Sequence, residues 1–474
     1  MLRARSCALT ALLLTGTATL PAWGQSANDS GPATIRYKGV SLTPVGFFAA
    51  EALVRQRNES ADLGSSFNAI PFSQTTNGQT SEFRLSGRQS RIALLANAKA
   101  NDIGLTGFWE ADFLSAGVTS NSNESNSYTL RIRQFFGQAA FANGFTVAGG
   151  QMWSLMTLTK TGVSPRAEYV PGTIDAQYAA GFTWARQAQV RFSQKLGDGA
   201  WLALSAEEPQ MTFAARNPPA GFVIGQTGGS QLNSTTNYST NFMPDVVAKL
   251  AFEPGFGHFE VKALGRMFRT RIVDLTNTNG GTRNDNVLAG GVGVGGFMPI
   301  TKRADLTITG LYGRGIGRYG TSQLPDATIN TDGTPEAIKQ IHGMVSLDVH
   351  ATPKLDLYLI GGSEYADRTA SISSAGKGVG YGSSILSNAG CDAEYAPTGA
   401  YAPGAPPAGT CNADTRSVSQ GNVGFWYRMV RGPSGTLQWG MQVSHTVRTT
   451  WDGLGDHPQA TENMVFSSFR YYLP

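Results

Sequence analysis

The sequence predicts an all-β protein: a closed antiparallel β-barrel of about sixteen strands that spans a membrane. Three observations lead to this fold class. Apolar and polar residues alternate along most of the chain, short and long connections alternate between the strands, and charged residues are scarce. They make up only 15% of the 474 residues, against about 25% in an average soluble domain. A wide barrel explains this scarcity, because half of every strand faces hydrocarbon.

The N-terminal residues have the pattern of a secretory signal. Arg3 and Arg5 precede the apolar run Cys7–Leu20, and Ala22 and Gly24 are small residues where a signal peptidase reads the chain. We therefore expect residues 1–24 to be a signal peptide, residues 25–41 a short periplasmic segment, and residues 42–474 the barrel.

Period-two alternation identifies the two faces of the strands. Between residues 42 and 57, Phe48, Ala52 and Val54 fall on one face, and Glu51 and Arg55 on the other. Residues 105–115, 245–252, 341–350 and 437–444 repeat the pattern. In a wide barrel the apolar face meets lipid and the polar face lines a wet lumen, so the polar positions are the candidate pore lining.

The connections alternate in length along the chain. Long connections all at one end are typical of an outer-membrane barrel, which has short periplasmic turns and long extracellular loops, whereas a soluble sandwich has no reason for this arrangement. The seven short connections are 101–104, 143–144, 197–199, 253–257, 301–304, 351–354 and 432–435. The eight long ones are roughly 58–81, 116–127, 153–181, 207–243, 272–286, 313–337, 367–416 and 449–461.

Basic residues recur on the face expected to line the lumen. Consecutive strands of a meander are neighbours, so these residues are expected to form a basic tract along part of the wall. After Gln89 the alternation slips by one residue, as a β-bulge would cause. The tract comprises Arg84, Arg88, Arg91, Arg131, Arg133, Arg186, Arg191 and Arg266, with Lys262 on the last of these strands. Inward-facing acidic residues are expected to cluster elsewhere, at Glu51, Glu110, Asp112 and Asp245.

Two interpretations of the basic tract remain open. The arginines could create a transverse field in a narrow pore, which would favour anions. Alternatively, arginines and carboxylates could pair across neighbouring strands and only brace the barrel. Glu110 and Asp112, for example, could neutralise Arg88 and Arg131 in this way.

The connection 153–181 is the candidate constriction. Pro165 and Pro171 stiffen it, and a loop folded into the lumen would narrow a channel. A surface loop like the others is the alternative, and from the residues alone it is the simpler one. The charged residues of the segment are Lys160, Arg166, Glu168 and Asp175.

Cys391 and Cys411 lie within the longest connection, 367–416. A cysteine pair in one loop of an exported chain is most simply a disulfide, which would contribute about 3 kcal/mol in the chain-entropy model. Metal binding is the weaker alternative, because no histidine lies nearby.

The sequence offers no catalytic, cofactor or metal site. Residues 315–320 fit the dinucleotide-binding fingerprint by letter, but they follow a strand and no helix comes after them to receive a pyrophosphate. The five histidines lack metal-ligand spacing. The net charge of +4 is too small and too scattered to indicate nucleic-acid binding.

Ten segments in order resemble the DcaP-like porins of Gram-negative outer membranes, which are relatives of the general trimeric porins. Each falls on an expected strand or strand end, and together they cover nearly the whole chain beyond the signal. They are Arg84–Arg91 (RLSGRQSR), Gly107–Phe113 (GFWEADF), Leu130–Gln134 (LRIRQ), Gly149–Trp153 (GGQMW), Val170–Asp175 (VPGTID), Phe182–Arg191 (FTWARQAQVR), Pro244–Leu250 (PDVVAKL), Gly313–Tyr319 (GRGIGRY), Gly424–Arg428 (GFWYR) and Phe466–Tyr472 (FSSFRYY).

The resemblance implies a sixteen-stranded barrel in the outer membrane, usually a homotrimer, that passes small hydrophilic solutes by diffusion. In the family the third long loop folds inward, which supports 153–181 as the constriction, and some members favour anions such as dicarboxylates. The C-terminal strand is expected to be read by the barrel-assembly machinery, although this chain ends in Leu473 and Pro474 instead of an aromatic residue. Two other functions stay open: a plugged barrel that binds partners through its surface loops as an adhesin or structural protein, and an exported all-β hydrolase.

Overall fold

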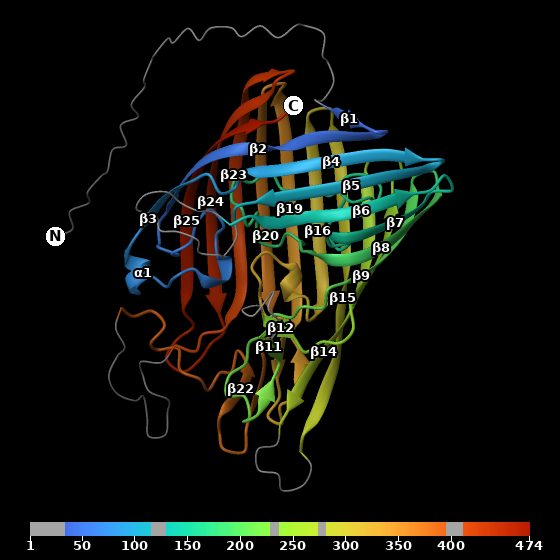
Figure 1. The fold of residues 1–474 in the computed structure, drawn as a ribbon. Coiled ribbons are helices and arrows are strands. Elements are labelled where there is room, and N and C mark those ends of the chain that lie inside the picture. The colour runs from blue at the N-terminus through green and yellow to red at the C-terminus, as the bar shows by residue number, and fades with distance from the viewer. Residues whose placement is uncertain (1–33, 115–128, 228–236, 274–280, 395–410) are drawn as a thin grey trace, which may run out of the picture.

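The computed structural model describes residues 34–114, 129–227, 237–273, 281–394 and 411–474. The expected signal peptide lies outside the described residues. Within them the chain forms a closed antiparallel barrel of sixteen strand positions, which confirms the predicted fold class (Figure 1). The first strand, β2 (Val40–Arg55), pairs with the last, β25 (Gln459–Tyr472), and this pairing closes the barrel.

The strands follow one another around the barrel as a meander. Two of them, β3 (Glu82–Ser86) and β4 (Arg91–Ala100), occupy one position because both pair with β2. The other positions are β5 (Ile103–Asp112), β6 (Arg131–Ala140), β7 (Phe145–Trp153), β8 (Arg186–Gly197), β9 (Ala200–Glu207), β13 (Asp245–Phe252), β14 (His258–Ile272), β15 (Arg283–Thr301), β16 (Ala304–Arg314), β19 (Lys339–Thr352), β20 (Leu355–Ala366), β23 (Thr415–Gly432) and β24 (Gly435–Thr450).

Short helices and strands lie at the ends of the barrel. β1 (Ile35–Tyr37) forms a hairpin with the start of β2, so regular pairing begins within the segment expected to precede the barrel. None of the described helices is long or apolar enough to cross a membrane. The remaining elements lie in the long connections: η1 (Phe67–Ala69), α1 (Thr76–Gln79), β10 (Phe222–Val223), β11 (Gly225–Thr227), β12 (Asn237–Ser239), η2 (Gly317–Tyr319), β17 (Ala327–Ile329), β18 (Pro335–Ala337), β21 (Thr369–Ile372) and β22 (Gly378–Tyr381).

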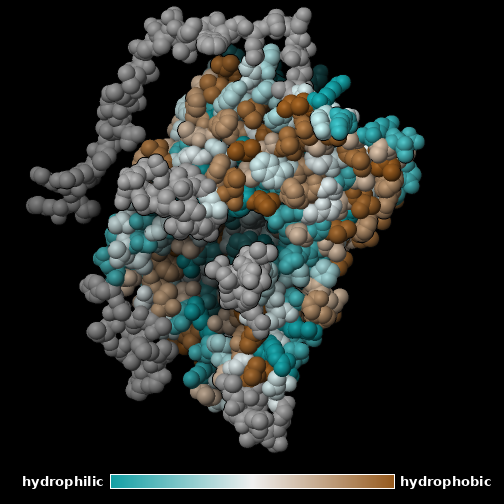
Figure 2. Space-filling model, in the orientation of Figure 1, coloured by the Kyte–Doolittle hydropathy of each residue, from teal (hydrophilic) through white to brown (hydrophobic). Residues whose placement is uncertain are grey.

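Both faces of the wall follow the predicted alternation. Leu85 is 71% exposed on the outside, whereas Arg133 is 2% exposed on the inside. Hydrophobic side chains spread over the wall formed by β2 to β9, and hydrophilic ones gather at its right-hand rim and around the hollow beside it (Figure 2). The apolar exterior is the surface that a barrel presents to lipid.

Two irregularities shift the alternation. Glu51 of β2 pairs with Ser86, and Phe47, four residues earlier in β2, pairs with Arg91, which is five residues after Ser86. The segment opposite β2 therefore contains one extra residue, a β-bulge, which brings Arg91 back to the inner face. This bulge confirms the predicted slip after Gln89. A second bulge in β6, opposite the Glu110–Ala111 step of β5, was not predicted; it turns both Arg133 and Gln134 inward.

All seven predicted short turns join consecutive strands at one end of the barrel, and the long connections leave the other end. Two long connections fold back into the lumen. One, residues 154–185, lies between β7 and β8; the other, residues 315–338, lies between β16 and β19. The main hydrophobic cluster of the molecule packs between the first of these loops and the inner wall, at Trp153, Tyr178 and Phe182 against Ile360, Val418 and Phe466.

Candidate functional site

The connection 154–185, which we call the inward loop, crosses the lumen. Its backbone N–H groups donate hydrogen bonds to side chains that project from widely separated strands. Leu155 binds Glu207 of β9 at 2.9 Å, Ile174 binds Gln442 of β24 at 2.6 Å, and Gly181 binds Glu364 of β20 at 2.9 Å. Such buried bonds to charged and amide acceptors fix the loop inside the barrel.

The basic and acidic residues of the inward loop differ in their exposure to water. Lys160 is exposed and lies 5.5 Å from the centre of the Tyr169 ring, and Arg166 is exposed and lies 4.6 Å from the centre of the Phe108 ring. Asp175 is buried and accepts hydrogen bonds from the N–H groups of Ser65 and Gln177. Burial raises the pKa values of the Asp175 and Glu168 carboxyls. The positive charges of the loop therefore face water more than the negative ones.

On the facing wall, arginines and carboxylates of β4, β5 and β6 form one ionic cluster. Asp112 accepts hydrogen bonds from Arg131 at 2.8 Å and from Arg133 at 2.8 Å. Glu110 lies 3.0 Å from Arg133 and 3.7 Å from Arg91. The expectation that Glu110 and Asp112 would cluster away from the basic tract is therefore wrong, because antiparallel pairing of the three neighbouring strands brings them into it.

Arg186, at the start of β8, completes this side of the lumen. Its guanidinium stacks on the rings of Trp153 and Trp184, with 4.7 Å and 5.1 Å to the ring centres. It also donates a hydrogen bond of 3.5 Å to the hydroxyl of Tyr178, which lies on the inward loop. Among the described residues no carboxylate lies within ion-pair distance of Arg186.

The other expected pore residues are mostly paired. Arg84 binds Glu82 at 3.0 Å, and Arg88 binds Asp62 at 2.7 Å, not Glu110 or Asp112. Arg191 lies beneath the inward loop and donates to the Trp153 carbonyl. Arg266 bridges Asp245 and Asp326, and Glu51 binds Arg470 at 2.6 Å. Arg470 was not among the expected pore residues, although its alternation with Phe469 and Tyr471 places it on the inner face.

A cavity of about 490 Å³ lies between the wall and the inward loop. Figure 2 shows a hollow with hydrophilic residues beside the wall formed by β2 to β9. Four arginines line the cavity, against two carboxylates. These residues are Arg91, Arg133, Arg166 and Arg470, and Glu110 and Glu168; Tyr178 and several further aromatic rings complete the lining.

The second inward loop, residues 315–338, was expected to be an ordinary surface connection. It joins the first one directly: Tyr319 accepts a hydrogen bond from the N–H of Trp184 at 2.8 Å, and the Thr321 hydroxyl donates to the Ala179 carbonyl at 2.6 Å. Glu364 of β20 accepts bonds from Gly181 of one loop and from Thr321 of the other. The two loops are thus joined to each other and to β20 inside the barrel.

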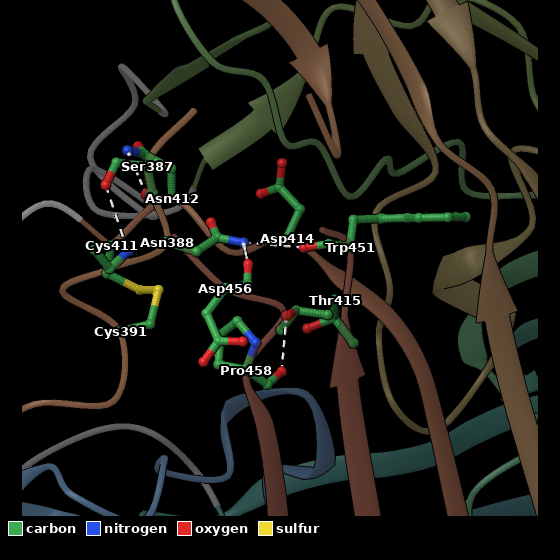
Figure 3. Close-up of a disulfide and its surroundings, with 12 residues drawn as sticks. Ser387, Asn388, Cys391, Cys411, Asn412, Asp414, Thr415, Trp451, Asp456 and Pro458 are labelled. Atoms are coloured by element: carbon green, nitrogen blue, oxygen red, sulfur yellow. Dashed lines mark hydrogen bonds between the residues drawn. A yellow bond between two sulfur atoms is a disulfide. The ribbon is translucent and has the colours of Figure 1, made fainter. Parts of the chain in front are cut away.

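The predicted disulfide between Cys391 and Cys411 is present (Figure 3). Around it, Asn388 donates to the carbonyls of Trp451 and Asp456, and Asn412 donates to the Ser387 carbonyl. The two bonds of Asn388 join the connection after β20 to the one after β24. In the described part of the chain, no group of three or more His, Cys, Asp or Glu side chains is placed to hold a metal ion.

Known proteins were compared with the chain in sequence and in structure. No family model matches the sequence, and no curated protein matches it significantly. The crystal structure of the outer membrane channel DcaP of Acinetobacter baumannii superposes with a TM-score of 0.64 at 19% identity, over 93% of this chain and 99% of that chain. This chain has the porin barrel fold. The resemblance to DcaP-like porins that the sequence indicates is thus confirmed at the level of the fold.

Other porin-like structures match less well. Salmonella typhi OmpF in complex with daunomycin gives a TM-score of 0.48 at 11% identity, over 93% of this porin-fold chain and 100% of that chain. The high-pH structure of OprB from Pseudomonas putida gives a TM-score of 0.45 at 11% identity, over 91% of this chain and 94% of that chain. These two scores are too low to support further conclusions.

Proposed function

We propose that this protein is an outer-membrane porin: a water-filled channel through which small hydrophilic solutes diffuse passively, with a preference for anions. The barrel supports the membrane location, because its outer face is apolar and its inner face is polar over the length of the strands. No covalent step is needed for this function, and we infer no catalytic residue.

The observation that carries the proposed selectivity is an imbalance of charge beside the cavity. Arg91, Arg131 and Arg133 share the two carboxylates Glu110 and Asp112, and Arg186 has no carboxylate partner among the described residues. Four guanidinium groups thus stand against two carboxylates. Both interpretations of the basic tract contribute: ion pairs brace the wall, and the excess charge favours anions.

We assign the constriction to the inward loop, and we propose small carboxylates, dicarboxylates among them, as the preferred solute class. Arg166 on the loop and Arg133 on the wall line the same cavity from opposite sides. Two guanidinium groups that face one passage suit a solute with carboxylates at both ends.

We further propose a homotrimer whose contact surface is the outer face of β4 to β7. These strands are short, with 9 or 10 residues each. Ala96, Gly107, Gly137 and Gly149 lie in register across them and form a flat row of small residues between larger apolar neighbours. A second copy of the chain can approach closely along such a row.

Export and assembly complete the proposal. Residues 1–24 would direct the chain to the periplasm, and β25, whose apolar face alternates up to Tyr471, would be read by the barrel-assembly machinery.

A plugged barrel that binds partners through its surface loops is the second candidate. The observation that favours it is the meeting of the two inward loops, which leaves little open lumen on the β16–β24 side.

Solute uptake into liposomes separates the two candidates. Liposomes that contain the purified protein are challenged with uncharged, anionic and cationic solutes of matched size. The porin predicts uptake of all small solutes, fastest for the anions. A plugged barrel predicts that these liposomes take up every solute as slowly as liposomes without protein. A faster uptake of cations than of anions would contradict the proposed selectivity.

A further inference from the structure

Tyr178 is held rigidly at the edge of the cavity. Only 3% of the residue is exposed, and its ring packs against Trp153, Phe182 and Trp184 with centroid distances of 5.9, 5.4 and 6.1 Å. This packing directs the hydroxyl from the inward loop toward the basic wall.

Two guanidinium groups donate hydrogen bonds to that hydroxyl. Arg133 does so at 3.0 Å and Arg186 at 3.5 Å. Among the described residues no oxygen accepts the hydroxyl proton in return. An oxygen that receives two bonds from cations and gives none is stabilised as an anion.

The charged groups around Tyr178 come from every element that faces it. β4 contributes Arg91, β5 contributes Glu110 and Asp112, β6 contributes Arg131 and Arg133, β8 contributes Arg186, β25 contributes Arg470, and the inward loop contributes Arg166 and Glu168. The carboxylates of β5 are already engaged by Arg131 and Arg133. Within the described part of the chain, the partners of Arg186 are this hydroxyl and two indole rings, so its charge is the one that Tyr178 can balance.

We propose that Tyr178 is an ionisable selectivity residue of the channel: its hydroxyl, held between the guanidinium groups of Arg133 and Arg186, releases its proton to water and then, as phenolate, cancels one guanidinium charge beside the passage. The role in selectivity rests on the proposed channel function. The anion preference is then full at acidic pH and falls as the pH rises.

The electrostatic surroundings agree with this role. Burial by itself raises the pKa of Tyr178, but Arg133, Arg186 and Arg91 outweigh burial and lower the pKa to about 7. Tyrosine in water titrates near pH 10. The hydroxyl is therefore neutral below about pH 7 and ionised above it.

The test compares the wild type with Tyr178→Phe in planar bilayers under a KCl gradient. In the wild type we expect the chloride-to-potassium permeability ratio to fall by about two- to tenfold between about pH 6 and about pH 8.5, the effect of one unit charge a few ångströms from the ion path. Tyr178→Phe keeps the acidic-pH ratio throughout, because phenylalanine cannot ionise. An identical pH dependence in both proteins would overturn the inference.

Tyr169→Phe is the matched control. Tyr169 lies on the same loop and is equally buried, but its hydroxyl donates to Asp348 at 3.2 Å and has no guanidinium partner. Burial and the Asp348 carboxylate raise its pKa, so this residue stays neutral. We expect the variant to keep the wild-type pH dependence.

A spectroscopic titration tests the ionisation itself, whether or not current flows. The ultraviolet absorbance of tyrosinate, wild type minus Tyr178→Phe, is expected to rise with a midpoint near pH 7. No rise below about pH 9 would show an ordinary tyrosine and sink the inference. A protein that ionises there but carries no current would instead overturn the porin and the selectivity role with it.

Discussion

Arg186 carries a positive charge that no carboxylate balances within the described structure, whereas Glu110 serves two arginines at once. Glu110 lines the cavity, and Arg186 lies behind the cavity-lining Tyr178, to whose hydroxyl it donates a hydrogen bond. At the scale of single residues, the selectivity that we propose therefore depends on small differences within an otherwise paired ionic cluster.

Neutralising either residue should shift selectivity in a defined direction. Arg186→Gln is expected to lower the chloride-to-potassium permeability ratio by about two- to tenfold, and Glu110→Gln to raise it by a similar factor. Reversal potentials at a fixed pH below 7 measure both effects. Lys195→Gln is the control, because it removes an exposed charge near the end of β8, where Lys195 pairs with Asp198, and should leave the ratio unchanged. Shifts of the same sign in both pore variants would contradict the electrostatic explanation.

The sequence predicts on which face a residue lies, but not its partner. Arg91 was placed inside correctly because the slip after Gln89 is visible in the alternation. The pair of Asp112 with Arg131 was one of the alternatives that the sequence left open, but Arg133 as the shared partner of Glu110 and Asp112 was not predicted, since it depends on the register between β5 and β6. That register contains a bulge at Arg133 and Gln134, and two consecutive polar residues in a strand give no unique sign of a bulge.

At the scale of elements, the position of the inward loop depends on the backbone conformation of Gly181. This glycine has a φ of +79°, and a Cβ there would lie 2.0 Å from the Gly343 carbonyl oxygen. A side chain at this position has to push the loop away from β19.

We expect Gly181→Ala to displace the loop, to raise the single-channel conductance and to lower the unfolding free energy by about 1–3 kcal/mol. Gly172→Ala, in the same loop, adds a Cβ that meets Tyr358 at an ordinary 3.5 Å and should behave as the wild type. Conductance measurements in bilayers separate the two. An unchanged conductance in Gly181→Ala would show that the loop does not limit flow.

We expect the disulfide to stabilise the loop end and not the barrel. Cys391 packs with Ile70, Phe72, Ala413 and Ala460, so the pair ties the connection after β20 to that after β2. Replacing both cysteines by serine is expected to speed proteolysis at the loop end, with a loss of at most about 3 kcal/mol, while heat-modifiable migration of the barrel on a gel is retained. Loss of that migration would place the disulfide among the determinants of the barrel.

Loops were the least predictable elements. The inward course of 154–185 was expected only from the family resemblance, because the segment has no period that marks a buried face. No pattern in residues 315–338 indicates a loop that folds inward, and the dinucleotide-binding fingerprint that residues 315–320 fit by letter does not bear on it. Both loops are fixed by side chains distant in sequence, such as Glu364 and Gln442, which only the closed barrel brings near them.

At the scale of the whole molecule, the alternation of short and long connections was enough to predict the barrel. Each short turn leaves two strands adjacent and antiparallel, so the meander follows without knowledge of any contact. The wall that would meet another subunit could not be read from the chain, because the small-residue row from Ala96 to Gly149 exists only after the strands are in register.

The proposed trimer is tested with bulky substitutions on that wall. Neither Gly137 nor Gly149 has another atom within 4 Å of a Cβ placed there, so tryptophan fits the single barrel. We expect Gly137→Trp to give monomers, or trimers that dissociate at lower temperature, in native gels and chemical cross-linking. Gly421→Trp on β23 is the control, since a Cβ at Gly421 is equally free of neighbours. Equal trimer stability in the two variants would exclude the β4–β7 wall as the interface.

The most direct test of the proposed channel is the zero-current potential of the purified protein in a planar bilayer under a KCl gradient. The structure predicts stepwise currents, grouped in threes for a trimer, with a potential whose sign reports chloride preference at acidic pH. A potassium preference would mean that the arginines beside Glu110 and Asp112 are fully neutralised. A folded barrel that carries no current would contradict the porin and favour the plugged barrel.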